Sequence, residues 1–177
     1  MIGCTADSVA DFSPVQGAGN WWYGWYGGPF TPSDFQRMTF NGTFWEVDFT
    51  RFYTLLNASG GHPNGTLSSR LPDVHWAVRR WVSPLSGTVT ISGVLAKTDR
   101  GDGNGVSGRI FHDGTEIFTR HIADNDSAGI SWSLDAAVLP GSIIDFAIDP
   151  ETNTRFDSTT FTANIRVHDC DEAAPAL

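Results

Sequence analysis

Hydrophobic and polar side chains alternate with a period of two along much of this chain. The alternation is clearest over residues 45–53, 74–79, 88–95, 132–138, 143–149 and 161–168. This is the period of an extended strand, because successive side chains of a strand point to opposite faces. No comparable stretch has the 3.6-residue period of a helix together with a capped start and end. The pattern therefore predicts an all-β protein.

Turn signals separate these runs. Asp113 and Gly114 lie between two apolar-rich segments and predict a hairpin with a type I′ turn, in which both central residues have positive φ. Residues 33–38, after Pro32, are compatible with one short helical turn. The spacing of strands and turns predicts a two-sheet antiparallel β-sandwich of the jelly-roll type, with residues 1–177 forming one domain. The irregular, aromatic and glycine-rich first third is expected to supply long loops over one end or face.

Composition and charge narrow the possible partners. The 19 glycines and 9 prolines suit a fold with many turns, and the net charge of −9 would repel a phosphate backbone or an anionic membrane surface. No apolar stretch approaches the roughly 18 residues of a membrane span. Neither nucleic acid nor membrane insertion is therefore expected.

The two cysteines lie near the two ends of the sequence. Cys4 and Cys170 could form a disulfide in an oxidising compartment, or they could be unrelated thiols, and their spacing leaves both alternatives open. The first residues lack the basic and apolar regions of a signal peptide, and residues 172–177 are typical of a linker. These features predict a module excised from a longer secreted protein and fused there to other domains.

The densest feature is the aromatic segment of residues 21–28. On a strand, Trp21 and Trp25 would share one face, and Trp22 and Tyr26 would share the other. Since a sandwich has one interior, either loops cover one of these sets or it forms an exposed aromatic patch of the kind that marks binding. Flat aromatic faces suit sugars, because pyranose rings present C–H bonds to the ring while hydroxyls bond to N–H or O–H groups.

Other tryptophans are assigned by the face they share with their neighbours. Trp45, Trp76 and Trp132 lie on apolar strand faces and are expected in the core, whereas Trp81 shares a face with His75 and Arg79 and is a surface candidate. The resulting ligand-binding candidates are the aromatic residues Trp21, Trp22, Trp25, Tyr26 and Trp81, with His62, Asn64 and Arg79 as polar partners.

Acidic, glycine-rich loops are candidate calcium sites, because Asp and Asn oxygens on a tight backbone suit that ion. Ordinary turns are the alternative for each of these loops. The metal-ligand candidates are Asp99, Asp102, Asn104 and Asp157.

Catalytic signatures are not evident. The five histidines are dispersed, and the sequence contains no H-E-x-x-H or G-x-S-x-G motif and no zinc-type spacing. A small polysaccharide-active enzyme would have to use acids such as Asp145 and Asp157 as a carboxylate pair.

Several runs resemble jelly-roll modules found in large secreted bacterial proteins. They are residues 11–13, which lead into the aromatic segment, and residues 75–81, 86–89, 101–103, 144–146 and 157–159. More broadly, the arrangement is similar to galactose-binding-like carbohydrate-binding modules. That resemblance implies a position beside glycoside hydrolases and a structural calcium, but it assigns no binding residue.

Taken together, the sequence predicts an extracellular, non-catalytic carbohydrate-binding module that recognises a polysaccharide or oligosaccharide through surface aromatics. A structural or adhesive spacer and a small polysaccharide-active enzyme are the alternatives.

Overall fold

The computed structural model describes residues 4–27 and 32–168, whose regular structure consists of strands and two short 3-10 helices. The helices are η1 (Ala18–Asn20) and η2 (Pro32–Asp34). The strands, in chain order, are β1 (Thr5–Asp7), β2 (Trp21–Gly27), β3 (Gln36–Arg37), β4 (Thr39–Phe40), β5 (Trp45–Glu46), β6 (Leu55–Leu56), β7 (Gly60–His62), β8 (His75–Val82), β9 (Gly87–Lys97), β10 (Val106–His112), β11 (Thr115–Ile122), β12 (Ile130–Val138), β13 (Ile143–Asp149), β14 (Thr159–Phe161) and β15 (Asn164–Val167).

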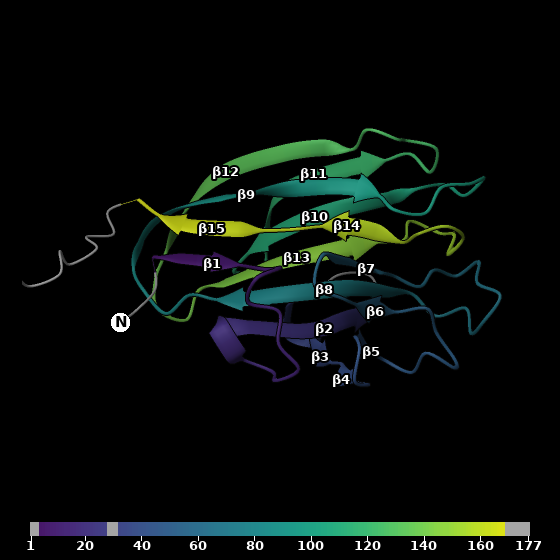
Figure 1. Ribbon diagram of the computed structural model, residues 1–177, viewed down its shortest axis with the longest axis horizontal. Coiled ribbons are helices and arrows are strands. Elements are labelled where there is room, and N and C mark those ends of the chain that lie inside the picture. Colours follow the sequence, from purple (N-terminus) through teal and green to yellow (C-terminus); the bar gives the residue numbers. More distant parts are fainter. Residues whose placement is uncertain (1–3, 28–31, 169–177) are drawn as a thin grey trace, which may run out of the picture.

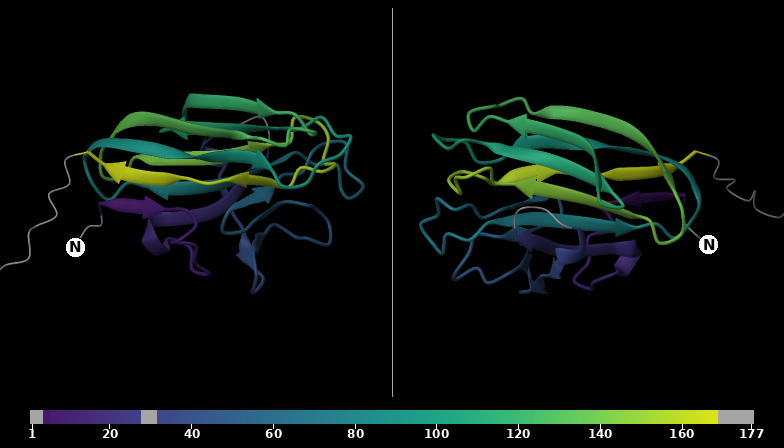
Figure 2. Two further views of the ribbon diagram at one scale, coloured as in Figure 1. Left: turned by 45° about the horizontal axis from the view of Figure 1, so that its top comes forward. Right: turned by 180° about the vertical axis from the view of Figure 1, so that it is seen from behind.

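The strands form two antiparallel sheets packed face to face (Figure 1). Within the described residues, one sheet has nine strands in the order β1-β15-β9-β14-β7-β6-β5-β4, with β12 on the other side of β9. The second sheet has six strands in the order β11-β10-β13-β8-β2-β3 and faces the viewer when the molecule is seen from behind (Figure 2). The predicted two-sheet antiparallel sandwich is confirmed.

Most of the predicted strands and the predicted hairpin are present. β8, β9, β12 and β13 coincide with four of the alternating runs, and β10 and β11 pair across Asp113 and Gly114. These two residues have φ of 46° and 85°, as a type I′ turn requires.

Three local predictions differ from the structure. In the run 45–53 only β5 is a strand, because the Asp48 carboxylate accepts the N–H of Thr50 at 3.1 Å and the Asp48 carbonyl accepts the N–H of Phe52 at 2.8 Å, which turns the chain. The run 161–168 is divided between β14 and β15. Residues 33–38 contain only the end of η2 and then β3.

The main core lies between the sheets and is rich in aromatic rings. Tyr23 of β2 stacks on Trp45 of β5 with ring centroids 5.1 Å apart, and Trp132 of β12 meets Phe161 of β14 edge-on at 5.8 Å. β2 thus contributes directly to the core and pairs with β8 and β3. Besides the loops expected there, the first third therefore contributes a core strand over residues 21–27.

A second apolar cluster covers the outer face of the six-stranded sheet. It contains Tyr26, Val78, Phe111 and Ala147, and Trp76 packs against it while remaining partly exposed. β2 and β8 are therefore apolar on both faces, so their alternation could not indicate which face points inward. The prediction of a core position is confirmed for Trp45 and Trp132, and it is wrong for Trp76, which lies on this outer face.

The two ends of the sandwich differ in character. At one end β1 pairs with β15, and the N–H of Val167 donates to the carbonyl of Cys4 at 3.0 Å. Cys170 lies outside the described residues, so the Cys4–Cys170 disulfide stays a prediction.

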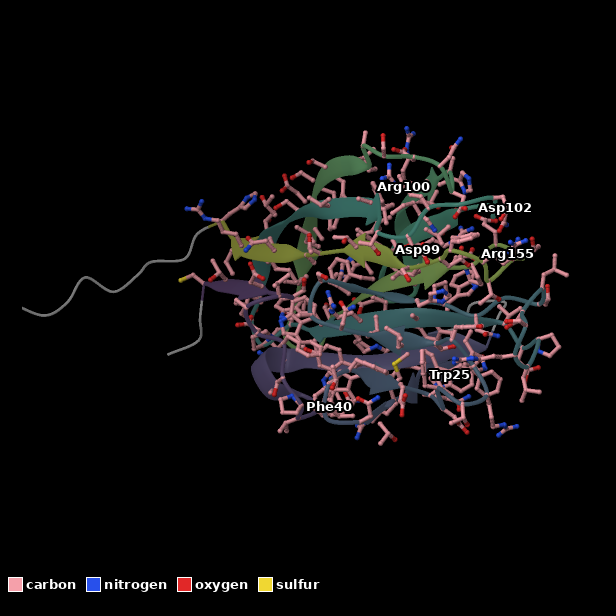
Figure 3. The ribbon with its side chains drawn as sticks, turned by 45° about the vertical axis from the view of Figure 1, so that its right-hand side comes forward. Trp25, Phe40, Asp99, Arg100, Asp102 and Arg155 are labelled. Atoms are coloured by element: carbon pink, nitrogen blue, oxygen red, sulfur yellow. The ribbon has the colours of Figure 1, made fainter. Side chains whose placement is uncertain are left out.

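The opposite end of the sandwich, which we call the loop end, contains the connections between strands over residues 47–54, 63–74, 98–105, 123–129 and 150–158. Asp99, Arg100, Asp102 and Arg155 lie together there (Figure 3). Within the described chain, no helix has both the length and the apolar character needed to cross a membrane.

Candidate functional site

Most of the predicted sugar-facing side chains are buried. The side chains concerned are Trp21, Tyr26, Asn64, Arg79 and Trp81, which are between 0 and 3 % exposed. The prediction that they face a ligand is wrong for these five. The face of β8 that carries Arg79 and Trp81 points into the core rather than to solvent, and Tyr26 is covered by the second apolar cluster.

Arg79 and Asn64 hold the backbone together instead of binding a ligand. The Arg79 guanidinium donates to the carbonyls of Asn57 at 2.6 Å, Ala58 at 3.1 Å and Phe161 at 3.3 Å. Complete burial lowers the pKa of Arg79 to about 10. The Asn64 amide donates to the Asp73 carbonyl at 2.6 Å, which fixes the loop that leads into β8.

Tyr26 belongs to a buried polar group on the outer sheet face. Its hydroxyl donates to the carboxylate of Asp145, and Arg80 pairs with the same carboxylate at 2.7 Å. Burial raises the pKa of Tyr26 and also that of Asp145, against the opposing effect of Arg80 on Asp145.

Trp22 and Trp25 are partly exposed, and each ring contacts another side chain. The Arg37 guanidinium lies 4.3 Å from the Trp22 ring centroid, at a hollow of about 250 Å³ on the outer sheet face. Trp25 packs against His75 with ring centroids 4.0 Å apart.

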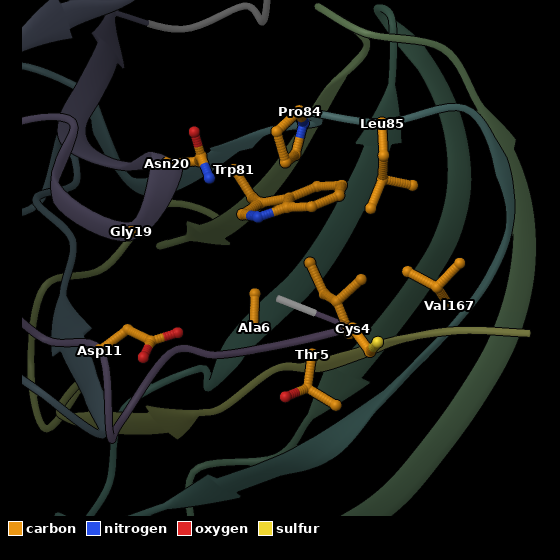
Figure 4. A pocket seen from close by; sticks show the side chains of 11 residues that line it. Cys4, Thr5, Ala6, Asp11, Gly19, Asn20, Trp81, Pro84, Leu85 and Val167 are labelled. Carbon is orange, nitrogen blue, oxygen red and sulfur yellow. The ribbon is translucent and has the colours of Figure 1, made fainter. Parts of the chain in front are cut away.

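A hollow of about 350 Å³ lies at the end of the sandwich that carries β1 and β15 (Figure 4). Trp81 and Leu85 border it on one side and Ala6 on another. The polar group beside it, the Asp11 carboxylate, already accepts the N–H of Asp7 at 2.8 Å and the indole N–H of Trp21 at 3.4 Å. Thr5 and Asn20 supply its other polar side chains, and among the described residues that line it the one aromatic side chain is the buried Trp81.

Two adjoining hollows at the loop end combine aromatic rings with polar side chains. Their volumes are about 280 and 250 Å³, and both are lined by Tyr53, His62 and Asp99. We call them together the loop-end groove. Its other lining residues are Phe49, Leu55, Asn57, Ser59, Gly61, Thr98, Ser158 and Thr159 in the larger hollow, and Ser69, Thr154, Arg155 and Phe156 in the smaller.

An arginine fixes the aromatic part of the loop-end groove. The Arg70 guanidinium lies 3.9 Å from the Tyr53 ring centroid and 4.2 Å from that of Phe49, and it donates to the Phe52 carbonyl at 2.6 Å. The Tyr53 hydroxyl is 2.9 Å from the hydroxyl of Ser69. The partly exposed Tyr53 ring is thus held in place before any ligand arrives.

His62, at the end of β7, is the one predicted binding residue that lines this groove. Its Nδ1 is 2.6 Å from the carbonyl of Pro63, and since a carbonyl can only accept, Nδ1 carries the hydrogen. Burial lowers the pKa of His62 to about 4. The imidazole is therefore neutral at neutral pH, and its Nε2 is a hydrogen-bond acceptor.

Polar side chains in the groove are positioned but not engaged. The backbone N–H groups of Thr98 and Asp99 both donate to the Ser158 carbonyl, at 3.0 and 3.4 Å. The Asp99 carboxylate and the hydroxyls of Thr98 and Ser158 make no hydrogen bond or ion pair with any described residue. The groove therefore combines ring surface with a free carboxylate and free hydroxyls.

Tyr53 and Phe49 are among the groove residues that the sequence did not indicate. They were assigned to a strand over residues 45–53, in which their side chains would have joined the core. The Asp48-x-Thr50 spacing is a turn signal that could have excluded them from the predicted strand, because such a carboxylate accepts the N–H of the residue two positions on.

The predicted metal ligands are not brought together. Asp102 pairs with Arg155 at 3.1 Å, and the Asn104 amide donates to Thr152 at 3.2 Å, whereas Asp99 lines the groove and Asp157 is buried. Among the residues that the structure describes, no group of three or more His, Cys, Asp or Glu side chains could hold a metal ion.

The proposed catalytic pair is also separated. Asp145 pairs with Arg80 on the outer sheet face, whereas Asp157 lies 3.7 Å from Lys97 at the loop end. Both carboxyl groups are at most 1 % exposed, so neither can meet a substrate and a water as a glycosidase acid or base must. Burial raises the pKa of Asp157 to about 8.

Comparison with known proteins gives only distant structural similarity. No protein-family model and no curated protein matches the chain. A family 35 carbohydrate-binding module from Clostridium thermocellum is similar with 11 % identity and a TM-score of 0.36, over 52 % of this chain and 72 % of that one. A CBM35 from Paenibacillus barcinonensis is similar with 12 % identity and a TM-score of 0.36, over 95 % of this chain and 100 % of that one. Rabbit GITRL is similar with 15 % identity and a TM-score of 0.35, over 60 % of this chain and 92 % of that one. Since proteins of different kinds are similar to the same degree, these comparisons do not select a ligand, and the fold assignment rests on the strand pairings.

Proposed function

We propose that this chain is a non-catalytic carbohydrate-binding module that binds a neutral saccharide in the loop-end groove. The observation that carries the proposal is the shared lining of the two hollows, in which the fixed Tyr53 ring lies beside the unengaged carboxylate of Asp99. An extracellular location and fusion to other domains fit this function and stay predictions.

The chemistry of the groove suits hydroxyl groups. Asp99 and the Nε2 atom of neutral His62 accept hydrogen bonds, while the Thr98 and Ser158 hydroxyls can donate or accept. The Tyr53 ring supplies an apolar surface for the C–H face of a pyranose. Because Asp99 carries a negative charge and the Arg155 guanidinium is paired with Asp102, a saccharide with carboxylate or sulfate groups is disfavoured and a neutral one is favoured.

The test is affinity electrophoresis against neutral and acidic polysaccharides, followed by calorimetry with oligosaccharides of any polymer that retards the protein. We expect Asp99→Ala to weaken binding by about tenfold to a hundredfold, because hydrogen bonds to a charged group contribute about 1.5–3 kcal/mol. Tyr53→Ala should weaken binding by about tenfold or more, whereas Tyr53→Phe, which retains the ring, should have a smaller effect.

Trp22→Ala is the matched control, because Trp22 is a partly exposed aromatic residue on the outer sheet face, away from the groove. It should bind as the wild type does. Retention that is lost with Trp22→Ala and kept with Asp99→Ala would move the site to the outer face and refute the loop-end assignment.

A spacer that binds no sugar is the second candidate, and the burial of Tyr26 and Trp81 favours it. The same electrophoresis decides between the two, since a spacer would migrate unretarded through every polysaccharide.

A further inference from the structure

A buried lysine lies beneath the loop-end groove. The side chain of Lys97, the last residue of β9, is fully buried, and its ammonium is 3.2 Å from Asp124 and 3.7 Å from Asp157. It also donates to the backbone carbonyl of Phe156. The ammonium is therefore surrounded by oxygen atoms from two loops that are distant from β9 in the sequence.

The same contacts hold a third loop. The second oxygen of Asp124 accepts the backbone N–H groups of Gly101 at 3.0 Å and Gly103 at 2.7 Å. The Asp124 carboxylate thus joins Lys97 to residues 98–105, which form one wall of the groove. Through Phe156 and Asp157 the same ammonium joins residues 150–158, which line the groove next to residues 98 and 99.

The loops pack closely around this centre. A Cβ atom on Gly101 would lie 2.4 Å from the Phe156 ring, and one on Gly103 would lie 2.4 Å from the Arg155 carbonyl. These contacts explain why the loop of residues 98–105 is rich in glycine without any role for the glycines in metal binding. These two loops can pack this closely only where side chains are absent.

Calcium does not fit this centre. The ion takes six to eight oxygen ligands at about 2.3–2.6 Å, and a fixed ammonium among the same oxygens would repel it. Of the four predicted ligands only Asp157 belongs to the centre. Asp102 and Asn104 are engaged elsewhere, and the Asp99 carboxylate lines the groove.

We infer that Lys97 is an internal cation that organises the loop end in place of a divalent metal. The fixed ammonium neutralises the buried carboxylate of Asp124 and orients the two loops, residues 98–105 and 150–158, that line the groove. This inference concerns the loops themselves and does not depend on what the groove binds.

The first test uses the wild-type protein. Its thermal unfolding midpoint should change by less than about 1 °C on addition of EDTA or of millimolar calcium chloride. A midpoint that falls in EDTA and recovers with calcium would overturn the inference, whatever the result of the sugar-binding assays.

The second test removes the ammonium. Lys97→Ser leaves Asp124 and Asp157 facing each other without a cation, so the midpoint should fall by roughly 5 °C or more, and calcium chloride should restore part of the loss where sodium chloride of equal ionic strength does not. Arg100→Ser, which removes an exposed cation three residues further on, should show neither effect.

Lys97→Arg keeps the charge and covers the case in which Lys97→Ser fails to fold. It should be more stable than the serine variant and indifferent to calcium. A Lys97→Ser protein as stable as the wild type, or a Lys97→Arg protein no more stable than the serine variant, would contradict the role of the cation.

Discussion

The guanidinium of Arg79 is a buried charge without a carboxylate partner among its hydrogen-bonded contacts. It donates to three backbone carbonyls, two in the turn after β6 and one at the end of β14, so it connects the two sheets through the backbone alone. The charge is tolerated because those carbonyl dipoles replace part of its hydration. This residue is therefore structural, although its type and position suggested a polar contact to sugar.

Arg79→Met should lower the free energy of unfolding by about 3 kcal/mol or more, because it leaves three buried carbonyls without donors. Urea denaturation is the measurement. Arg100→Met, at an exposed arginine, is the control and should stay within about 0.5 kcal/mol of the wild type. A small loss for Arg79→Met would mean that water can replace the guanidinium.

At the scale of elements, the pairing of β7 with β14 positions the groove. β7 carries His62, β14 begins with Thr159, and the two strands pair through Gly60 and Gly61. A Cβ atom on Gly60 would lie 1.9 Å from the Thr159 carbonyl. The close approach of these strands therefore requires glycine at position 60.

Gly60→Ala should lower the free energy of unfolding by about 2–4 kcal/mol and loosen the loop-end groove, because one of the two strands must move. Gly27→Ala is the matched control in a strand, since the nearest atom to its added Cβ would be at the ordinary contact distance of 3.8 Å. Equal stability of the two variants, measured by urea denaturation, would contradict the steric argument.

The alternation of apolar and polar side chains predicted the inward face correctly for some strands and was ambiguous for others. β9 and β12 have one apolar face each, and their bounds follow the sequence pattern closely. β2 and β8 have apolar side chains on both faces, so Trp76 and Trp81 were assigned to the wrong faces. The pattern contained no information on the second apolar cluster that covers the outer face.

For the whole molecule, buried titratable groups make stability depend on pH. The pKa of Asp157 is about 8 in the folded protein because of burial, compared with 3.8 for an ordinary Asp. A raised pKa means that the folded state binds the proton more tightly. The contribution of Asp157 to stability is therefore fully present below about pH 4 and is lost as the pH rises through about 8.

Asp157→Asn should accordingly reduce the fall in unfolding free energy that the wild type shows between about pH 4 and about pH 8. The measurement is urea denaturation at a series of pH values. Asp102→Asn, at an exposed carboxylate, should retain the wild-type dependence. A parallel pH dependence for wild type and Asp157→Asn would show that Asp157 titrates normally.

The sequence by itself determined the fold class and most long strands of this protein, because strand alternation and turn chemistry are local properties. Asp113 and Gly114, with the apolar segments beside them, were sufficient to predict the type I′ turn. The sequence also identified the loop of residues 97–105 and His62 as candidates for a functional role.

Only the tertiary structure decided which aromatic rings reach solvent and what the acidic loops surround. Burial of Trp81 and Tyr26 depends on which sheet face points inward, and that is set by packing between strands far apart in the sequence. Likewise, the acidic loops resembled calcium sites, because their sequences cannot indicate that Asp124 and Asp157 of two other loops pack on Lys97, or that Asp102 and Asn104 are engaged elsewhere.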